Sequence, residues 1–226
     1  MKTILASLAC AATLIGAASA ATFTLDFGPN AESSNTPATG ASASVTFDFA
    51  DQGDDVLLTL TLANTTGDVT FGAGATTSMF TGFAFDLIDG VSVISTQLGT
   101  AFDSELAAVQ FNPFSNRPDV GAFDIGLADN NNFNGGNANG ALGAGLIDTV
   151  TLLLDTSLDA GALMIAYLEA FRSGDADAAV RFQRVGQGGS DKLLFVDPNP
   201  VPVPGALLLF GTAMVGGAVA RRRRVA

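Results

Sequence analysis

A regular alternation of apolar and polar residues in the middle of the chain constrains its fold more than any other feature. In residues 45–49, valine and phenylalanine alternate with Thr46 and Asp48, and in residues 58–62 leucine alternates with Thr59 and Thr61. Successive side chains of a β-strand point to opposite faces of its sheet. Each segment therefore predicts a strand with one buried and one wet face; further examples are 83–87, 123–127 and 150–154.

Shorter segments of the same character extend this pattern along the chain, at residues 22–27, 91–95, 180–185 and 193–196. Glycine, asparagine, aspartate and proline separate the segments, and these residues favour turns. About eight or nine strands with wet outer faces predict a mainly β fold with two antiparallel sheets. We expect a β-sandwich of the jelly-roll kind.

The segment 159–171 departs from the period of two. Its large apolar residues recur every four positions and so share one face of a helix. Ser157 or Asp159 is placed to cap the start of this helix, and Gly174 is placed to end it. The sequence therefore predicts one short helix at the edge or end of the sandwich.

The first twenty residues have the composition of a secretory signal peptide. Lys2 supplies a positive charge, an apolar stretch follows it, and small residues close the segment before Ala21. We expect cleavage between Ala20 and Ala21. The leader is then residues 1–20, and the β-sandwich domain is residues 21–197.

The C-terminal residues 198–226 contain three features in a fixed order. A proline motif is followed by an uncharged apolar segment at 205–220 and then by four arginines. The apolar segment is at the short end of what crosses a bilayer as a helix. The arginines stay on the cytoplasmic side by the positive-inside rule, which leaves the preceding domain outside. The residues of the motif and the cluster are Val201, Pro202, Val203, Pro204, Arg221, Arg222, Arg223 and Arg224.

This arrangement resembles the PEP-CTERM sorting signal in its VPLPA-like variant. The resemblance implies that the tail is recognised by exosortase, a membrane-embedded transpeptidase-like protease that removes it. It also implies an inner-membrane (cytoplasmic-membrane) anchor before processing, then a place at the cell surface or outside the cell, with a link to exopolysaccharide or biofilm. Val203 stands where the commonest form of the signal has glutamate, so the exosortase subtype stays open. Residues 71–90 and 179–194 resemble stretches of uncharacterised exported proteins with this kind of tail, which adds no activity.

The charge between the two ends excludes several classes of partner. Without Lys2 and the four C-terminal arginines, five cations stand against 22 acidic residues, a net charge of −17. Such a surface repels nucleic-acid phosphates and anionic lipid headgroups. We therefore expect no nucleic-acid partner, and we expect good solubility or the binding of cations.

The residue types needed for common catalytic sites are missing from the sequence. It has no histidine, and its one cysteine, Cys10, lies in the leader. The domain therefore cannot build a Cys/His zinc site, a thiolate nucleophile or a Ser-His-Asp triad. This composition favours a protein that is not an enzyme.

One loop could hold a hard cation. Oxygen atoms of Asp129, Asn130, Asn132 and Asn134, beside a glycine turn, are the ligands that calcium prefers. The loop lacks the closing glutamate of an EF-hand, because position 141 is alanine. The alternative is a solvent-exposed loop in which asparagine and glycine adopt left-handed conformations. Apart from this calcium, no cofactor is predicted.

Two other polar motifs are predicted to have structural roles. Arg181 and Arg184 are expected to pair with carboxylates at the surface, and Asn64 begins an N-x-T sequence that is a coincidence in a bacterial protein. The sequence thus predicts an exported, non-enzymatic cell-surface or extracellular-matrix protein. The alternative is a calcium-dependent carbohydrate-binding module.

Overall fold

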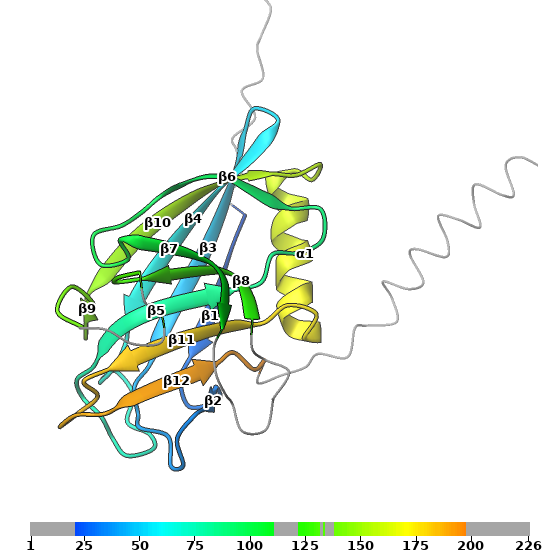
Figure 1. The fold of residues 1–226 in the computed structure, drawn as a ribbon. Coiled ribbons are helices and arrows are strands. Elements are labelled where there is room, and N and C mark those ends of the chain that lie inside the picture. Colours follow the sequence, from blue (N-terminus) through cyan, green and yellow to red (C-terminus); the bar gives the residue numbers. More distant parts are fainter. Residues whose placement is uncertain (1–20, 111–121, 132, 134–137, 198–226) are drawn as a thin grey trace, which may run out of the picture.

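The computed structural model describes residues 21–110, 122–131, 133 and 138–197, which form a mainly β fold with one helix (Figure 1). The predicted leader and the predicted C-terminal sorting signal lie outside these residues. The elements are β1 (Ala21–Phe27), β2 (Glu32–Ser33), β3 (Ala43–Gln52), β4 (Asp55–Asn64), β5 (Met79–Phe85), β6 (Ser92–Gln97), β7 (Ser104–Gln110), β8 (Ala122–Ala128), β9 (Leu142–Gly143), β10 (Ile147–Asp155), α1 (Ala160–Ser173), β11 (Ala178–Gln183) and β12 (Ser190–Leu194).

The strands form two antiparallel sheets, which fit the predicted β-sandwich. The first sheet, sheet A, has the order β1-β3-β4-β10-β6. The second, sheet B, has the order β2-β12-β11-β5-β8-β7, and β9 pairs with β5. Pairing of β3 with β4 is regular over ten residue pairs, from Ala43 opposite Asn64 to Gln52 opposite Asp55. The chain crosses repeatedly from one sheet to the other.

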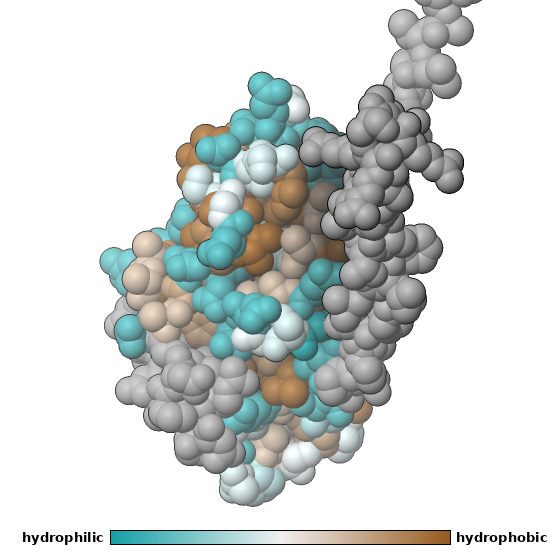
Figure 2. Space-filling model, turned by 90° about the vertical axis from the view of Figure 1, so that its right-hand side faces the viewer, coloured by the Kyte–Doolittle hydropathy of each residue, from teal (hydrophilic) through white to brown (hydrophobic). Residues whose placement is uncertain are grey.

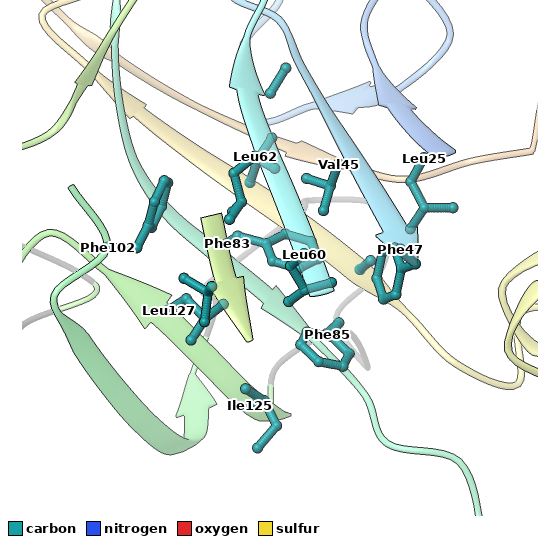
Figure 3. Packing of buried hydrophobic residues seen from close by; sticks show 14 of the residues in the cluster. Leu25, Val45, Phe47, Leu60, Leu62, Phe83, Phe85, Phe102, Ile125 and Leu127 are labelled. Atoms are coloured by element: carbon teal, nitrogen blue, oxygen red, sulfur yellow. The ribbon is translucent and has the colours of Figure 1, made fainter. Parts of the chain in front are cut away.

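The core lies between the sheets and consists mainly of phenylalanine, leucine and valine. Figure 3 shows inward side chains of sheet A, among them Leu60 and Phe47, facing Phe83 and Phe85 of sheet B. The rings of Phe47 and Phe85 meet edge to face with centroids 5.7 Å apart, a favourable geometry for aromatic pairs. The alternation predicted for β3, β4 and β10 is confirmed, because buried and partly exposed residues alternate along each of these strands.

Helix α1 begins and ends where the sequence predicts. The Asp159 side chain accepts a hydrogen bond from the Ala162 N–H, and Gly174 ends the helix with a left-handed φ of 79°. A second carboxylate, that of Asp51, accepts from the Ala160 N–H at 2.7 Å. The rings of Phe171 and Phe47 meet edge to face with centroids 5.6 Å apart, so the helix packs on the inner side of β1 and β3.

Sheet B differs from the prediction of one buried and one wet face per strand. Strands β5 and β11 are buried on both faces almost along their whole length. A second, smaller apolar cluster covers the outer side of sheet B and explains this burial: Ala84, Val109, Phe123, Ala128, Phe133, Ala179 and Leu194. Strand β7 and the two-residue strands were not predicted.

Among the described residues, no helix is long and apolar enough to cross a membrane. Figure 2 looks onto the side of the molecule that carries α1, where apolar and polar residues are interspersed. Ile165 on α1 is 52% exposed. Single exposed apolar residues of this kind are normal on soluble surfaces.

Candidate functional site

A polar cleft of about 800 Å³ lies where three loops meet beside the start of β12. Its walls are the segment 73–77, the turn 185–190 and the side chains of Asn35 and Thr39. Turn 185–190 is held by a 3.0 Å hydrogen bond from the Gly188 N–H to the Val185 carbonyl. Gly186 donates across the cleft base to the Thr77 carbonyl at 2.8 Å.

The cleft is backed by Asp191, which is 1% exposed and anchors one of its walls. One carboxylate oxygen accepts from Ser33 Oγ at 2.8 Å and from Asn35 Nδ2 at 2.9 Å. The other accepts from the Thr39 hydroxyl at 2.6 Å and from the Thr39 N–H at 3.1 Å. A buried carboxylate is tolerated when hydrogen bonds replace its water, so Asp191 fixes the segment 33–39 against β12.

The chemistry of the cleft lining is neutral. Its polar side chains are hydroxyls and amides, and none of its lining residues carries a charge: Asn35, Thr39, Thr76, Thr77, Gln187 and Ser190. The remaining lining residues are glycine, alanine and valine. Groups of this kind exchange hydrogen bonds with uncharged polar ligands. The carboxylate that backs the cleft, Asp191, is occupied by the hydrogen bonds from Ser33, Asn35 and Thr39.

A smaller hollow of about 260 Å³ lies between β1, α1 and the end of the described chain. Arg172 of α1 and Asp197 line it and form an ion pair with 3.4 Å between Nε and Oδ2. Because the Arg172 side chain is 50% exposed, water screens this pair and its contribution to stability is small. Asp197 is the last described residue before the segment 198–226 that is predicted to be the sorting signal.

Two of the four predicted calcium ligands, Asp129 and Asn130, lie within the described residues, whereas Asn132 and Asn134 do not. Asp129 is 9% exposed; its Oδ1 accepts from Asn130 Nδ2 at 2.8 Å, and its Oδ2 is buried without a hydrogen-bond partner. Burial raises the pKa of Asp129, and the nearby Arg181 charge opposes that rise. Within the described segments, no three Asp, Glu, His or Cys side chains converge on a metal position.

Phe133 is the unpredicted anchor of this asparagine-rich loop. Its side chain is 5% exposed and packs on the outer side of sheet B. The ring occupies the space above Gly82, where an added Cβ would lie 2.7 Å from it, and a Cβ on Gly126 would also contact it. Two features of the sequence could have indicated that Phe133 is buried. It is a phenylalanine within a run of asparagines, and two of the predicted strands contain or directly follow a glycine that leaves room for a ring.

The prediction that Arg181 lies at the surface is wrong. Arg181 is 7% exposed on β11, and its Nη1 lies 3.5 Å from the Thr81 hydroxyl. Burial lowers its pKa, while the Asp129 charge raises it. Arg184 follows β11 with a φ of 49° and donates to Asn139 Oδ1 at 2.7 Å, so it holds the end of the asparagine-rich loop.

Three aspartates gather where β5 ends. Asp86 accepts from the Asp177 N–H at 2.8 Å, and Asp124 accepts from the Leu87 N–H at 2.9 Å. Burial, with smaller additions from the charges of Asp177 and Asp124, raises the pKa of Asp86 to about 6, against the opposing effect of the Asp177 amide.

The Tyr167 hydroxyl also faces the Asp86 and Asp124 charges. Tyr167 is fully buried, and burial raises the pKa of its hydroxyl well above its usual value. The Ile88 backbone partly opposes this rise, although its geometry falls short of a hydrogen bond.

Asn64, the first residue of the N-x-T sequence, is 1% exposed and is a structural residue. Its Nδ2 donates to the Leu142 carbonyl at 2.9 Å and to the Ser78 carbonyl at 3.2 Å. Its Oδ1 accepts from the Thr66 N–H. The side chain therefore joins β4 to the strands of sheet B, and its amide is not accessible for modification in the folded chain.

Comparison with known proteins adds no relative: no family model, no curated protein and no solved structure matches the chain. The sites are therefore interpreted from the residues themselves.

Proposed function

We propose that this chain is an exported, non-enzymatic protein of the cell surface or extracellular matrix. Exosortase sorts and processes it through the C-terminal signal, and it associates with exopolysaccharide. The observation that carries the proposal is the pair of chain ends, with a leader before Ala21 and the ordered motif, apolar segment and arginines after residue 200. The described body between them has a polar cleft lined by hydroxyl and amide side chains, which suit the binding of uncharged polar ligands such as sugars. Repeated crossing between the sheets supports the jelly-roll-like topology.

The export step is tested by following the two ends of the chain in a host that contains an exosortase. We expect the mature N-terminus at Ala21 and loss of the arginine cluster, measured by mass spectrometry of intact protein from the surface and medium fractions. Pro202→Ala combined with Pro204→Ala should leave the tail attached and the protein in the inner membrane. A cytosolic protein with both ends intact contradicts the proposal.

A calcium-dependent carbohydrate-binding module is the second candidate. The buried Oδ2 of Asp129, which has no hydrogen-bond partner, favours it, because such an oxygen is available to a cation. The Arg181 charge opposes it, since a guanidinium near the same carboxylate repels a metal ion. Calorimetry with calcium decides between these effects. The module is supported if calcium gives binding heat and raises the Tm of the wild type, and if Asp129→Asn removes both effects. It is excluded if calcium gives the wild type no heat and no rise in Tm.

A further inference from the structure

Threonines form a regular array on sheet A. Thr24, Thr46, Thr61 and Thr149 are direct cross-strand partners and make one row over β1, β3, β4 and β10 (Figure 1). The next row contains Thr22, Asp48, Thr59 and Thr151 in the same four strands. Gln97 of β6 extends this second row. Within β1, β3, β4 and β10, threonine thus fills every position of the two rows except that of Asp48. These eight residues of the four strands, without Gln97, are the threonine face.

The threonine face points away from the core. The residues that alternate with it, such as Phe47, Leu60 and Val150, are fully buried. Thr22, Thr24 and Thr149 are exposed, and the other five members are partly exposed. The Thr24 and Thr46 hydroxyls lie 2.9 Å apart within hydrogen-bonding distance. Neighbours in a row are about 4.8 Å apart, and the rows are separated by about 6.7 Å.

The described cations all lie outside sheet A. None of the five strands of sheet A contains lysine or arginine. The described cations lie on α1 and around β11 and β12: Arg172, Arg181, Arg184 and Lys192. Asp48 is therefore a carboxylate amid hydroxyl groups, with no cation on its own sheet.

We propose that the threonine face binds a linear polysaccharide whose sugar units carry free amino groups. The rows of hydroxyls can exchange hydrogen bonds with successive sugar units, because an extended hexose chain repeats at nearly the spacing of neighbouring strands. Asp48 pairs with an ammonium group, a charge-assisted hydrogen bond. The net charge of −17 between the chain ends repels acidic polysaccharides, which makes an amino-sugar polymer the complementary partner.

This inference rests on the proposed export, because such polymers lie outside the cell. The binding test does not depend on export, because it uses purified protein. The competing explanation of the array is stability, since threonine favours strands and cross-strand threonine pairs stabilise sheets. Valine separates the two explanations: it has the shape of threonine and favours strands equally, yet it has no hydroxyl.

The experiment measures binding of the full-length protein to β-1,4-linked glucosamine oligomers by calorimetry, at mildly acidic pH where the amines are protonated. Asp48→Asn and the double variant Thr59→Val with Thr61→Val should each weaken binding about tenfold, which is about 1.4 kcal/mol. Glu105→Gln, on exposed β7 of sheet B, removes the same charge elsewhere and should leave affinity unchanged. Fully N-acetylated oligomers should bind about tenfold more weakly, and polyuronates should not bind.

Three results would overturn the inference. They are no binding at all, equal weakening by Asp48→Asn and Glu105→Gln, and equal affinity for the amino and N-acetylated oligomers. Unchanged binding in the double valine variant, with its fold confirmed by circular dichroism, would assign the threonines to stability alone. Because purified protein is used, a protein that binds the oligomers but stays in the cytosol would refute the proposed export and leave this site standing.

Discussion

The carboxylate of Asp86 accepts a 2.8 Å hydrogen bond from the backbone of Asp177, which is itself acidic, and Asp86 donates its own N–H to the Asp177 carbonyl at 3.0 Å. The two acidic residues are thus fixed side by side where β5 ends and β11 begins. Their contact joins the strands, but it also holds a negative charge in a partly buried place. The raised pKa of Asp86 is the consequence.

Asp86→Asn should stabilise the protein at neutral pH. The pKa of Asp86 is about 6 in the folded chain and near its usual 3.8 when unfolded, so the folded state binds the extra proton between these values. Wild-type stability therefore falls as the pH rises from about 4 to about 6. Asparagine at position 86 removes this loss of unfolding free energy, which is about 1 kcal/mol after solvent screening is taken into account. Its side-chain oxygen can still accept the hydrogen bond from the Asp177 N–H.

The measurement is the Tm of both proteins as a function of pH. The Tm difference should be small near pH 4 and should reach its full value above pH 6. Asp89→Asn, at an exposed position three residues away, is the matched control for loss of a carboxylate outside this contact. A constant difference between wild type and Asp86→Asn at every pH would contradict the prediction.

Asp191→Ala should be among the most damaging single substitutions. It leaves the partly buried Ser33, Asn35 and Thr39 donors without their acceptor. The loss of unfolding free energy should be about 3 kcal/mol, measured by urea denaturation. Limited proteolysis should cut the segment 33–39 sooner than in wild type. Asp191→Asn keeps the size of the side chain and removes its charge. If this variant is as stable as wild type, the negative charge is not needed for stability.

The alternation of apolar and polar residues was enough to predict the strands that have one face on the core and one face on solvent. β3, β4 and β10 are such strands, and every second residue along most of their length is buried. β7 was missed because Ala108 has a φ of 52° and takes no part in the pairing with β8, so its alternation is broken. β5 and β11 were found, but their second face is buried by a cluster that includes Val109, Phe123 and Phe133, residues that are distant from both strands in the sequence.

The polar residues that shape the sites were harder to predict than the strands. Asp191 and Arg181 look like surface residues in the sequence, and both are buried against residues far along the chain. Asp191, for instance, bonds Thr39, which lies 152 residues earlier. The threonine face was visible as T-x-T segments, but the alignment of those segments depends on strand order, which the sequence did not provide.

Gly72→Ala should distort the wall of the polar cleft. Gly72 has a φ of 54°, and an added Cβ would collide with the Ala38 carbonyl oxygen. That oxygen accepts the 2.7 Å hydrogen bond from the Ala73 N–H that holds the segment 71–75 in place. We expect a loss of about 2–3 kcal/mol in urea unfolding. Gly53→Ala is the control: its φ is also positive but its surroundings are open, so about 1 kcal/mol should be lost.

Phe133 and Gly82 should be energetically coupled, because the ring lies where a side chain at position 82 would be. Phe133→Ala alone should cost about 3 kcal/mol, from loss of the apolar cluster outside sheet B. Gly82→Ala alone should also destabilise, since its Cβ would come within 2.7 Å of the ring. In the double variant the collision disappears, and alanine at 82 should cost little. A double-mutant cycle by urea denaturation should therefore give a coupling energy of about 1–2 kcal/mol, and strictly additive effects would show that the ring does not rest on Gly82.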